Sequence, residues 1–163
     1  MRELNKKIIE WAKEREIDKK GTVERQSIKT AEEISELIKG ICKNDIDLIK
    51  DSIGDVYVTL VIGNMLSIQL DLEEYYNDVR EALRTDIIEE KEAEILCLLD
   101  VSRDILENGY FEDQIFDSMG NLMAMAYIYD LDFKDCVEFA YNEISNRKGK
   151  MIDGQFVKES DLT

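Results

Sequence analysis

Residues 46–69 read IDLIKDSIGDVYVTLVIGNMLSIQ, and this stretch decides the fold. Its apolar side chains recur three and four residues apart, which is typical of one face of an α-helix: Ile46, Ile49, Ile53, Val56 and Leu60. Beyond this stripe almost every residue is apolar. We therefore expect a helix that Asn44 or Asp45 caps, that runs to about Gln69, and that is buried on most sides in a bundle.

The rest of the chain also favours helices, because its 163 residues contain no proline and only 8 glycines. Helical spacing and turn residues predict about six to seven helices in all, with the others over residues 2–16, 23–43, 71–83, 87–107, 112–130 and 133–147. Breaks are expected at 18–21, 85–86 and 108–109. The core stripe of the second helix is expected at Ala31, Ile34, Ile38 and Ile41. Near the end, Asp153 and Gly154 separate two short apolar runs, which predicts a small β-hairpin.

An internal repeat is visible in the sequence. DSIGD at residues 51–55 recurs as DSMGN at 117–121, LD at 70–71 as LD at 131–132, and YNDV at 76–79 as YNEI at 141–144. We predict one all-α domain over residues 1–163, with repeat halves at 23–84 and 87–147 and a tail at 148–163. Chance similarity between two acidic amphipathic helices is the alternative.

The formal charge of −16, from 37 acidic and 21 basic residues, argues against nucleic acid and membrane surfaces as partners. The first 17 residues are charged throughout, and no run of about 18 apolar residues follows, so we expect a cytoplasmic protein. Cys42, Cys97 and Cys136 are expected to be reduced core thiols. The absence of histidine argues against zinc and Cys/His chemistry.

Two carboxylate pairs are the candidate metal ligands. Glu33 and Glu36 are three residues apart on one predicted helix, off its expected core stripe, and Asp51 and Asp55 are four apart on the next. A short turn makes these helices antiparallel neighbours, so both pairs are expected to converge, and a divalent cation relieves their repulsion. The alternative is that these are ordinary solvated helix faces. Gly54 supports a special site, because a glycine inside an apolar helix needs the close approach of a helix or a ligand.

Basic residues gather in two places, Arg25 with Lys29 and Arg147 with Lys148 and Lys150. In so acidic a chain they are candidates for binding phosphate, and the alternative is solvated cations at helix ends. Trp11 and Phe111 are candidates to stack on a nucleobase, although aromatic side chains at helical spacing more often belong to the core.

TAEEISEL at residues 30–37, followed by DSIGDV at 51–56, resembles the MazG-like family of all-α nucleoside triphosphate pyrophosphohydrolases. The end of the chain, YNEISNRKGKM at 141–151, also resembles phage and bacterial members of that family. The resemblance covers residues 22–80 and 131–160. It implies Mg²⁺ as cofactor, with Mn²⁺ as substitute, and cleavage of a nucleoside triphosphate between its α and β phosphates.

By this resemblance Glu33 and Glu36 take the first two metal-ligand and catalytic positions, and Asp55 takes the last. Ser52 stands where the family has a glutamate, and Asp51 is the candidate to replace it.

The second repeat resembles the decayed half of dimeric dUTPases, since Asn121 replaces the equivalent of Asp55. This makes dUTP a substrate candidate, and the family implies a homo-oligomer, a dimer or tetramer. Two rivals stay open: an inactive relative, and a non-enzymatic acidic helical interaction protein. Calcium sensing is disfavoured, because the chain lacks a twelve-residue loop of alternating oxygen ligands.

Overall fold

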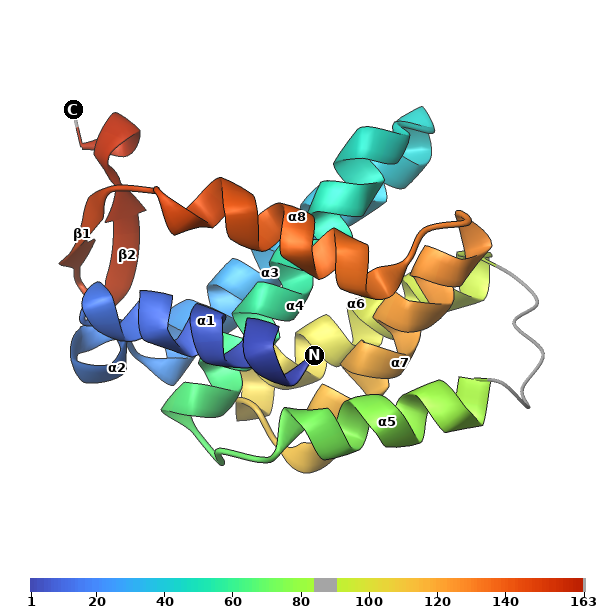
Figure 1. Cartoon of the computed structure of the whole chain (residues 1–163), viewed down its shortest axis with the longest axis horizontal. Helices are drawn as coiled ribbons and strands as arrows, with labels where there is room; N and C mark the ends of the chain where they lie inside the picture. Colours follow the sequence, from blue (N-terminus) through green and yellow to red (C-terminus); the bar gives the residue numbers. More distant parts are fainter. Residues whose placement is uncertain (84–90, 163) are drawn as a thin grey trace.

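A computed structural model describes residues 1–83 and 91–162, and within them the chain is all-α with a C-terminal hairpin (Figure 1). The helices are α1 (Arg2–Glu14), α2 (Ile17–Lys20), α3 (Val23–Lys43), α4 (Ile46–Leu66), α5 (Leu72–Leu83), α6 (Lys91–Asn108), α7 (Glu112–Ile128) and α8 (Phe133–Ser145). Strands β1 (Gly149–Ile152) and β2 (Gln155–Lys158) follow, and then a 3-10 turn (Glu159–Asp161). The predicted fold class is confirmed. The expected junction at residues 85–86 and the expected start of a helix at residue 87 lie outside the described residues.

Helix α4 is the central helix, as its sequence predicts. From Ser52 to Asn64 every residue except Asp55 is buried, because α3 packs along one side and α8 along another. Asp45 caps the start of α4, accepting a hydrogen bond from the backbone N–H of Leu48 at 3.2 Å. The helix ends at Leu66, before the expected Gln69, since the Asn64 side chain bonds the backbone of Leu70 and turns the chain. Ile46 was expected in the core but is 42% exposed.

Gly54 allows α4 and α8 to approach closely. A Cβ atom on Gly54 would lie 2.6 Å from the Cβ of Ala140 and would collide with the Cys136 carbonyl. Another helix, rather than a ligand, therefore explains this glycine.

The start of the chain differs from the prediction. Helix α1 ends at Glu14, and Glu16 adopts a left-handed φ of 58°, so the break precedes residues 18–21. Residues 17–20 instead form α2, whose Ile17 is buried against the core. This short helix brings the described total to eight.

The predicted core stripe of α3 is fully buried only at Ile34, whereas Ile38 and Ile41 are partly buried and pack against the core and Ala31 is half-buried. The buried face instead consists of Ser27, Thr30, Glu33, Ile34, Leu37 and Gly40. Polar residues can occupy it because they have partners: the Thr30 hydroxyl lies 2.9 Å from the Thr59 hydroxyl and 2.7 Å from that of Tyr110.

The expectation of three core thiols holds only for Cys136, which is buried, whereas Cys42 and Cys97 are exposed. In the part of the chain that the structure describes, no helix is both long and apolar enough to cross a membrane.

The hairpin packs at one end of the helical bundle, beside α1 and α2 (Figure 1). Asp153 and Gly154 both have positive φ, 47° and 82°, as a two-residue turn requires. The turn is fastened to the start of α3. The Thr22 N–H donates to the Gly154 carbonyl at 3.3 Å, and the Arg25 Nε donates to the Asp153 carbonyl at 3.2 Å.

Candidate functional site

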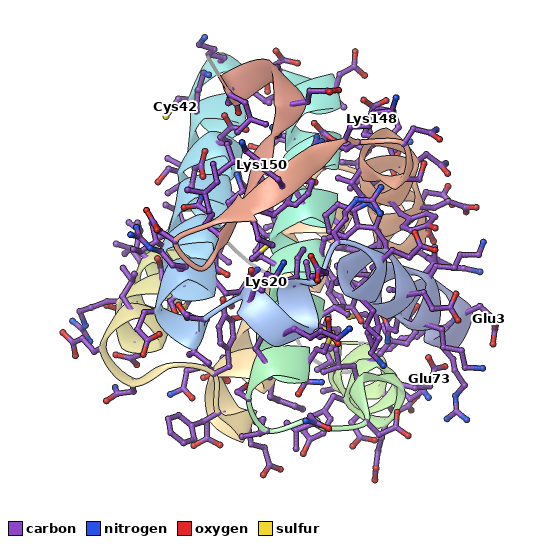
Figure 2. All side chains as sticks on the ribbon, turned by 90° about the vertical axis from the view of Figure 1, so that its left-hand side faces the viewer. Glu3, Lys20, Cys42, Glu73, Lys148 and Lys150 are labelled. Carbon is purple, nitrogen blue, oxygen red and sulfur yellow. The ribbon has the colours of Figure 1, made fainter. Side chains whose placement is uncertain are left out.

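A cavity of about 80 Å³ that opens to the surface lies between the hairpin, α1, α3 and α4. Figure 2 faces the hairpin, which crosses in front of α3 and α4. Charged, amide and apolar side chains all line the cavity, among them Trp11, Ile17, Arg25, Gln26, Lys29, Glu33, Asp55, Val58, Thr59, Ile62, Arg147, Phe156 and Lys158. Two of the four predicted carboxylates, Glu33 and Asp55, are therefore in its wall.

Glu33 lies on the buried face of α3 and is 6% exposed, whereas the sequence had placed it off the core. Its carboxylate is neutralised by Lys29, whose Nζ lies 2.6 Å from Glu33 Oε1 and 2.8 Å from Glu32 Oε2. Burial lowers the pKa of Lys29, but the Glu33 and Glu32 carboxylates outweigh that effect, so the net shift is upward. Lys29 is therefore a charged group held at the carboxylates.

Asp55 carries the most strongly perturbed carboxyl of the predicted site. Its burial, followed by the charges of Glu33 and Asp51, raises the pKa of Asp55 to about 7, although Arg147 and Lys29 oppose the rise. Within the described residues its carboxyl makes no hydrogen bond or ion pair. A proton-accepting group that titrates near neutral pH thus faces the cavity.

Asp51 lies one turn before Asp55 and toward α8. Burial raises its pKa, and the largest charge effect comes from Glu143, ahead of Glu33. Its Oδ1 atom is buried and has no hydrogen-bond partner among the residues that the structure describes. An unpaired buried carboxylate oxygen costs free energy, so this corner of the site would favour a cation.

Glu143 was missed by the sequence reading, and so was Arg15. Glu143 comes four residues before Arg147 on the last turns of α8, a spacing that could have indicated it. Arg15 donates from Nη2 to the Arg147 carbonyl at 2.9 Å and to the Ser145 carbonyl at 3.2 Å. It therefore fastens the segment that carries Arg147 into the cavity.

The predicted phosphate-binding cations are divided by the structure. Lys29 and Arg147 lie with the carboxylates, and Lys158, which the sequence reading missed, also lines the cavity. Arg25 is at the hairpin turn, where its guanidinium holds the Asp153 carbonyl. Lys148 and Lys150 are exposed (Figure 2) and do not line the cavity. They line a second surface hollow with Glu14 and Glu159, and Arg147 borders both.

The carboxylate oxygens of the candidate site are suitable ligands for a hard divalent cation, but they are not already arranged around one. Among residues 1–83 and 91–162, no three acidic side chains are arranged to share a metal ion as they stand. Glu36 is exposed, although its charge contributes to the raised pKa of Asp51. The fit rests on the oxygen-only ligands, the unpaired Oδ1 of Asp51 and the mutual repulsion at Asp55, all of which suit Mg²⁺ or Mn²⁺.

The counterparts of the carboxylate pair in the predicted second repeat do not line this cavity. Asp117 and Asn121, the counterparts of Asp51 and Asp55, lie on α7 and are not among the residues that line it.

Comparison with known proteins finds a relative in a phage. No protein-family model matches the chain, and no solved structure matches it. An 18.2 kDa protein of Haemophilus phage HP1 (strain HP1c1), described as uncharacterized and encoded in the rep-hol intergenic region, is 45% identical over 62 residues. The aligned part covers 38% of this chain and 38% of that protein. The similarity therefore relates part of this chain to a phage protein and attaches no activity to it.

Proposed function

We propose that this protein hydrolyses a nucleoside triphosphate to the monophosphate and pyrophosphate with Mg²⁺ as cofactor, as its resemblance to the MazG-like family implies. The observation that carries the proposal is that Glu33 and Asp55 share the wall of one cavity with Lys29 and Arg147, while the charge of Asp51 acts on Asp55 from one helical turn away. Perturbed carboxylates with a specific charge partner in a cleft are typical of functional sites.

The proposed metal ligands are Asp51, Asp55 and Glu33. Glu36, which is exposed, is proposed as a further ligand at the edge of the site. Magnesium, when bound, supplies neutralisation of phosphate charge and a lowered pKa of a bound water. Lys29 is within reach of the same carboxylates, and we expect its ammonium to turn from Glu33 to a phosphate oxygen when nucleotide binds.

The chain's own residues supply the rest of the reaction. Arg147 and Lys29 hold phosphate oxygens and offset the charge that develops on the leaving pyrophosphate. As the water oxygen bonds to the α-phosphorus, the bond from that phosphorus to the bridging oxygen breaks and the electron pair leaves with pyrophosphate. The proposed acceptor of the water proton is a carboxylate of this set that the metal would not saturate.

Pyrophosphate release from deoxynucleoside triphosphates, dUTP included, tests the proposal. We expect turnover that requires Mg²⁺ or Mn²⁺ and that falls at least a hundredfold in Asp55→Asn and in Glu33→Gln. Glu32→Gln is the matched control, because Glu32 is the exposed neighbour that also contacts Lys29 but does not line the cavity. Absent turnover, or turnover that persists in EDTA, would falsify the proposal.

A non-enzymatic interaction protein is the second candidate, and one observation favours it. Helix α6 exposes an apolar face, with Leu96 63%, Leu99 47% and Leu106 48% exposed. Exposed apolar patches often mark protein contacts. If pyrophosphate release is absent while Leu99→Glu alters the oligomeric state or a partner complex, this second candidate replaces the enzyme.

A further inference from the structure

The cavity has two chemically different ends, and their separation follows from α3. Arg25, Gln26, Lys29 and Glu33 line it from the start of α3 toward its middle. At 1.5 Å per residue, the eight residues from Arg25 to Glu33 span about 12 Å. The carboxylate end is thus about two helical turns from the hairpin turn that Arg25 holds.

Helix α4 runs antiparallel to α3, and it too contributes residues to both ends of the cavity. The Gln26 Nε2 donates to the Thr59 carbonyl at 3.1 Å, which pairs the start of α3 with the second half of α4. Asp55 interacts with Glu33 at the other end. Val58 and Ile62, which also line the cavity, therefore lie toward Gln26, on the side away from Asp55.

The hairpin closes the end at the start of α3, which is lined by apolar side chains together with Arg25 and Gln26. Its turn contacts Thr22 and Arg25 at the start of α3, while Arg147, which precedes β1, acts on Asp55 at the charged end. Phe156 lines the cavity and meets Trp11 edge to face, with ring centroids 5.7 Å apart. The aromatic and aliphatic walls are thus supplied by Phe156, Ile17, Val58 and Ile62.

We propose that the end beneath the hairpin turn binds the nucleobase of the substrate, with Phe156 as its aromatic wall and Gln26 as the residue that reads its edge. This inference rests on the proposed function, because it takes the charged end as the place of the triphosphate. It makes the hairpin, which lies outside the predicted repeat halves, the element that determines which nucleotide is accepted.

The Gln26 amide has the chemistry for this role. One of its two N–H groups bonds the Thr59 carbonyl, whereas its Oε1 and second N–H have no partner within the described residues. Nucleobases present a donor and an acceptor side by side on one edge, which an amide can match, and their flat faces pack on aromatic rings. Inorganic polyphosphate offers neither feature, so its affinity should not depend on the residues at this end of the cavity.

Trp11 provides a direct measurement, since it is the single tryptophan of the chain and lines the cavity. The probes are the deoxynucleosides deoxyuridine, deoxycytidine, deoxyadenosine and deoxyguanosine, and inorganic tripolyphosphate with Mg²⁺. We expect at least one deoxynucleoside to change the Trp11 fluorescence saturably. Phe156→Ala and Gln26→Leu should each raise its Kd at least tenfold and leave the Kd of tripolyphosphate within twofold.

Ile152→Ala is the matched control, because Ile152 is on the same hairpin but is 39% exposed and outside the cavity. Phe156→Ala changes the hairpin itself, whereas Gln26→Leu changes only α3. Weaker deoxynucleoside binding in Gln26→Leu therefore cannot be attributed to a disturbed hairpin. The inference is overturned if no deoxynucleoside produces a saturable change, or if Gln26→Leu binds every deoxynucleoside as wild type does. Nucleoside binding without pyrophosphate release would refute the proposed function alone. Turnover with an unchanged base preference in both variants would refute this inference alone.

Discussion

Replacing Asp55 by asparagine should stabilise the metal-free protein at alkaline pH. Burial and the charges of Glu33 and Asp51 raise the folded-state pKa of Asp55 from 3.8 to about 7. The folded state therefore binds a proton that the unfolded state has already released between these values, and stability must fall as pH rises through this window. A difference of about 3 pH units at 1.36 kcal/mol each is worth about 4 kcal/mol.

Asp55→Asn removes this penalty, because the amide stays neutral and the Asp55 carboxyl makes no hydrogen bond within the described residues. For a chain of this size, about 4 kcal/mol corresponds to a Tm increase of roughly 8–16 °C at pH 8. At about pH 3 the two proteins should melt together, since Asp55 is then mostly protonated in both the folded and the unfolded state. Differential scanning calorimetry in EDTA from about pH 3 to about pH 8 measures the divergence.

Glu138→Gln is the control for the calorimetry, because Glu138 is exposed on α8 and its replacement should give a curve parallel to wild type. The reasoning is refuted if Asp55→Asn also runs parallel to wild type, or if it is the less stable protein at pH 8. Saturating Mg²⁺ should narrow the gap by stabilising wild type more than the variant, since the carboxylate is a proposed ligand.

Three further changes test other parts of the structure. Lys29→Met leaves the buried Glu33 carboxylate without its ammonium, so urea unfolding in EDTA should show a loss of about 1–3 kcal/mol. The Tm gain from added Mg²⁺ should exceed that of wild type. Ser52→Glu places the family's glutamate at a position that is 2% exposed; it should lower Tm in EDTA and increase the Mg²⁺-dependent Tm shift, and an unchanged shift would argue against a metal ion beside α4. Gly54→Ala pushes a methyl group into α8 and should cost about 1–3 kcal/mol or more in urea unfolding, whereas Gly120→Ala, with only a 4.0 Å contact, should cost less than 1 kcal/mol.

The central helix could be predicted because its signal is redundant. From Ile49 to Ile62, apolar residues lie on every side of α4. The prediction that this helix is buried therefore does not depend on which of its faces is assigned to the core. Helix α3 had no such redundancy. Its buried face includes Ser27, Thr30 and Glu33, which are stabilised there by hydrogen bonds and an ion pair. A search for regularly spaced apolar residues cannot identify such polar positions as buried.

The same distinction separates the site residues that the sequence identified from those it missed. Glu33 and Asp55 were identified from spacing along two helices that follow each other in the chain. Arg15 and Glu143 act through the packing of α1 and α4 against α8, more than a hundred and about ninety residues away in sequence, respectively. No local pattern encodes that proximity, because it depends on how the helices pack.

The charge balance of the cavity explains why an acidic protein would bind a triphosphate only together with metal. The charges that act on Asp55 at the charged end are two further carboxylates, Glu33 and Asp51, and two cations, Lys29 and Arg147. With Asp55 ionised, this end is therefore negative, and the chain's net charge of −16 adds to the repulsion of any polyphosphate. A divalent cation reverses the local sign, so that the same cations can then attract phosphate oxygens. Metal and nucleotide binding should accordingly be coupled, each raising the affinity for the other.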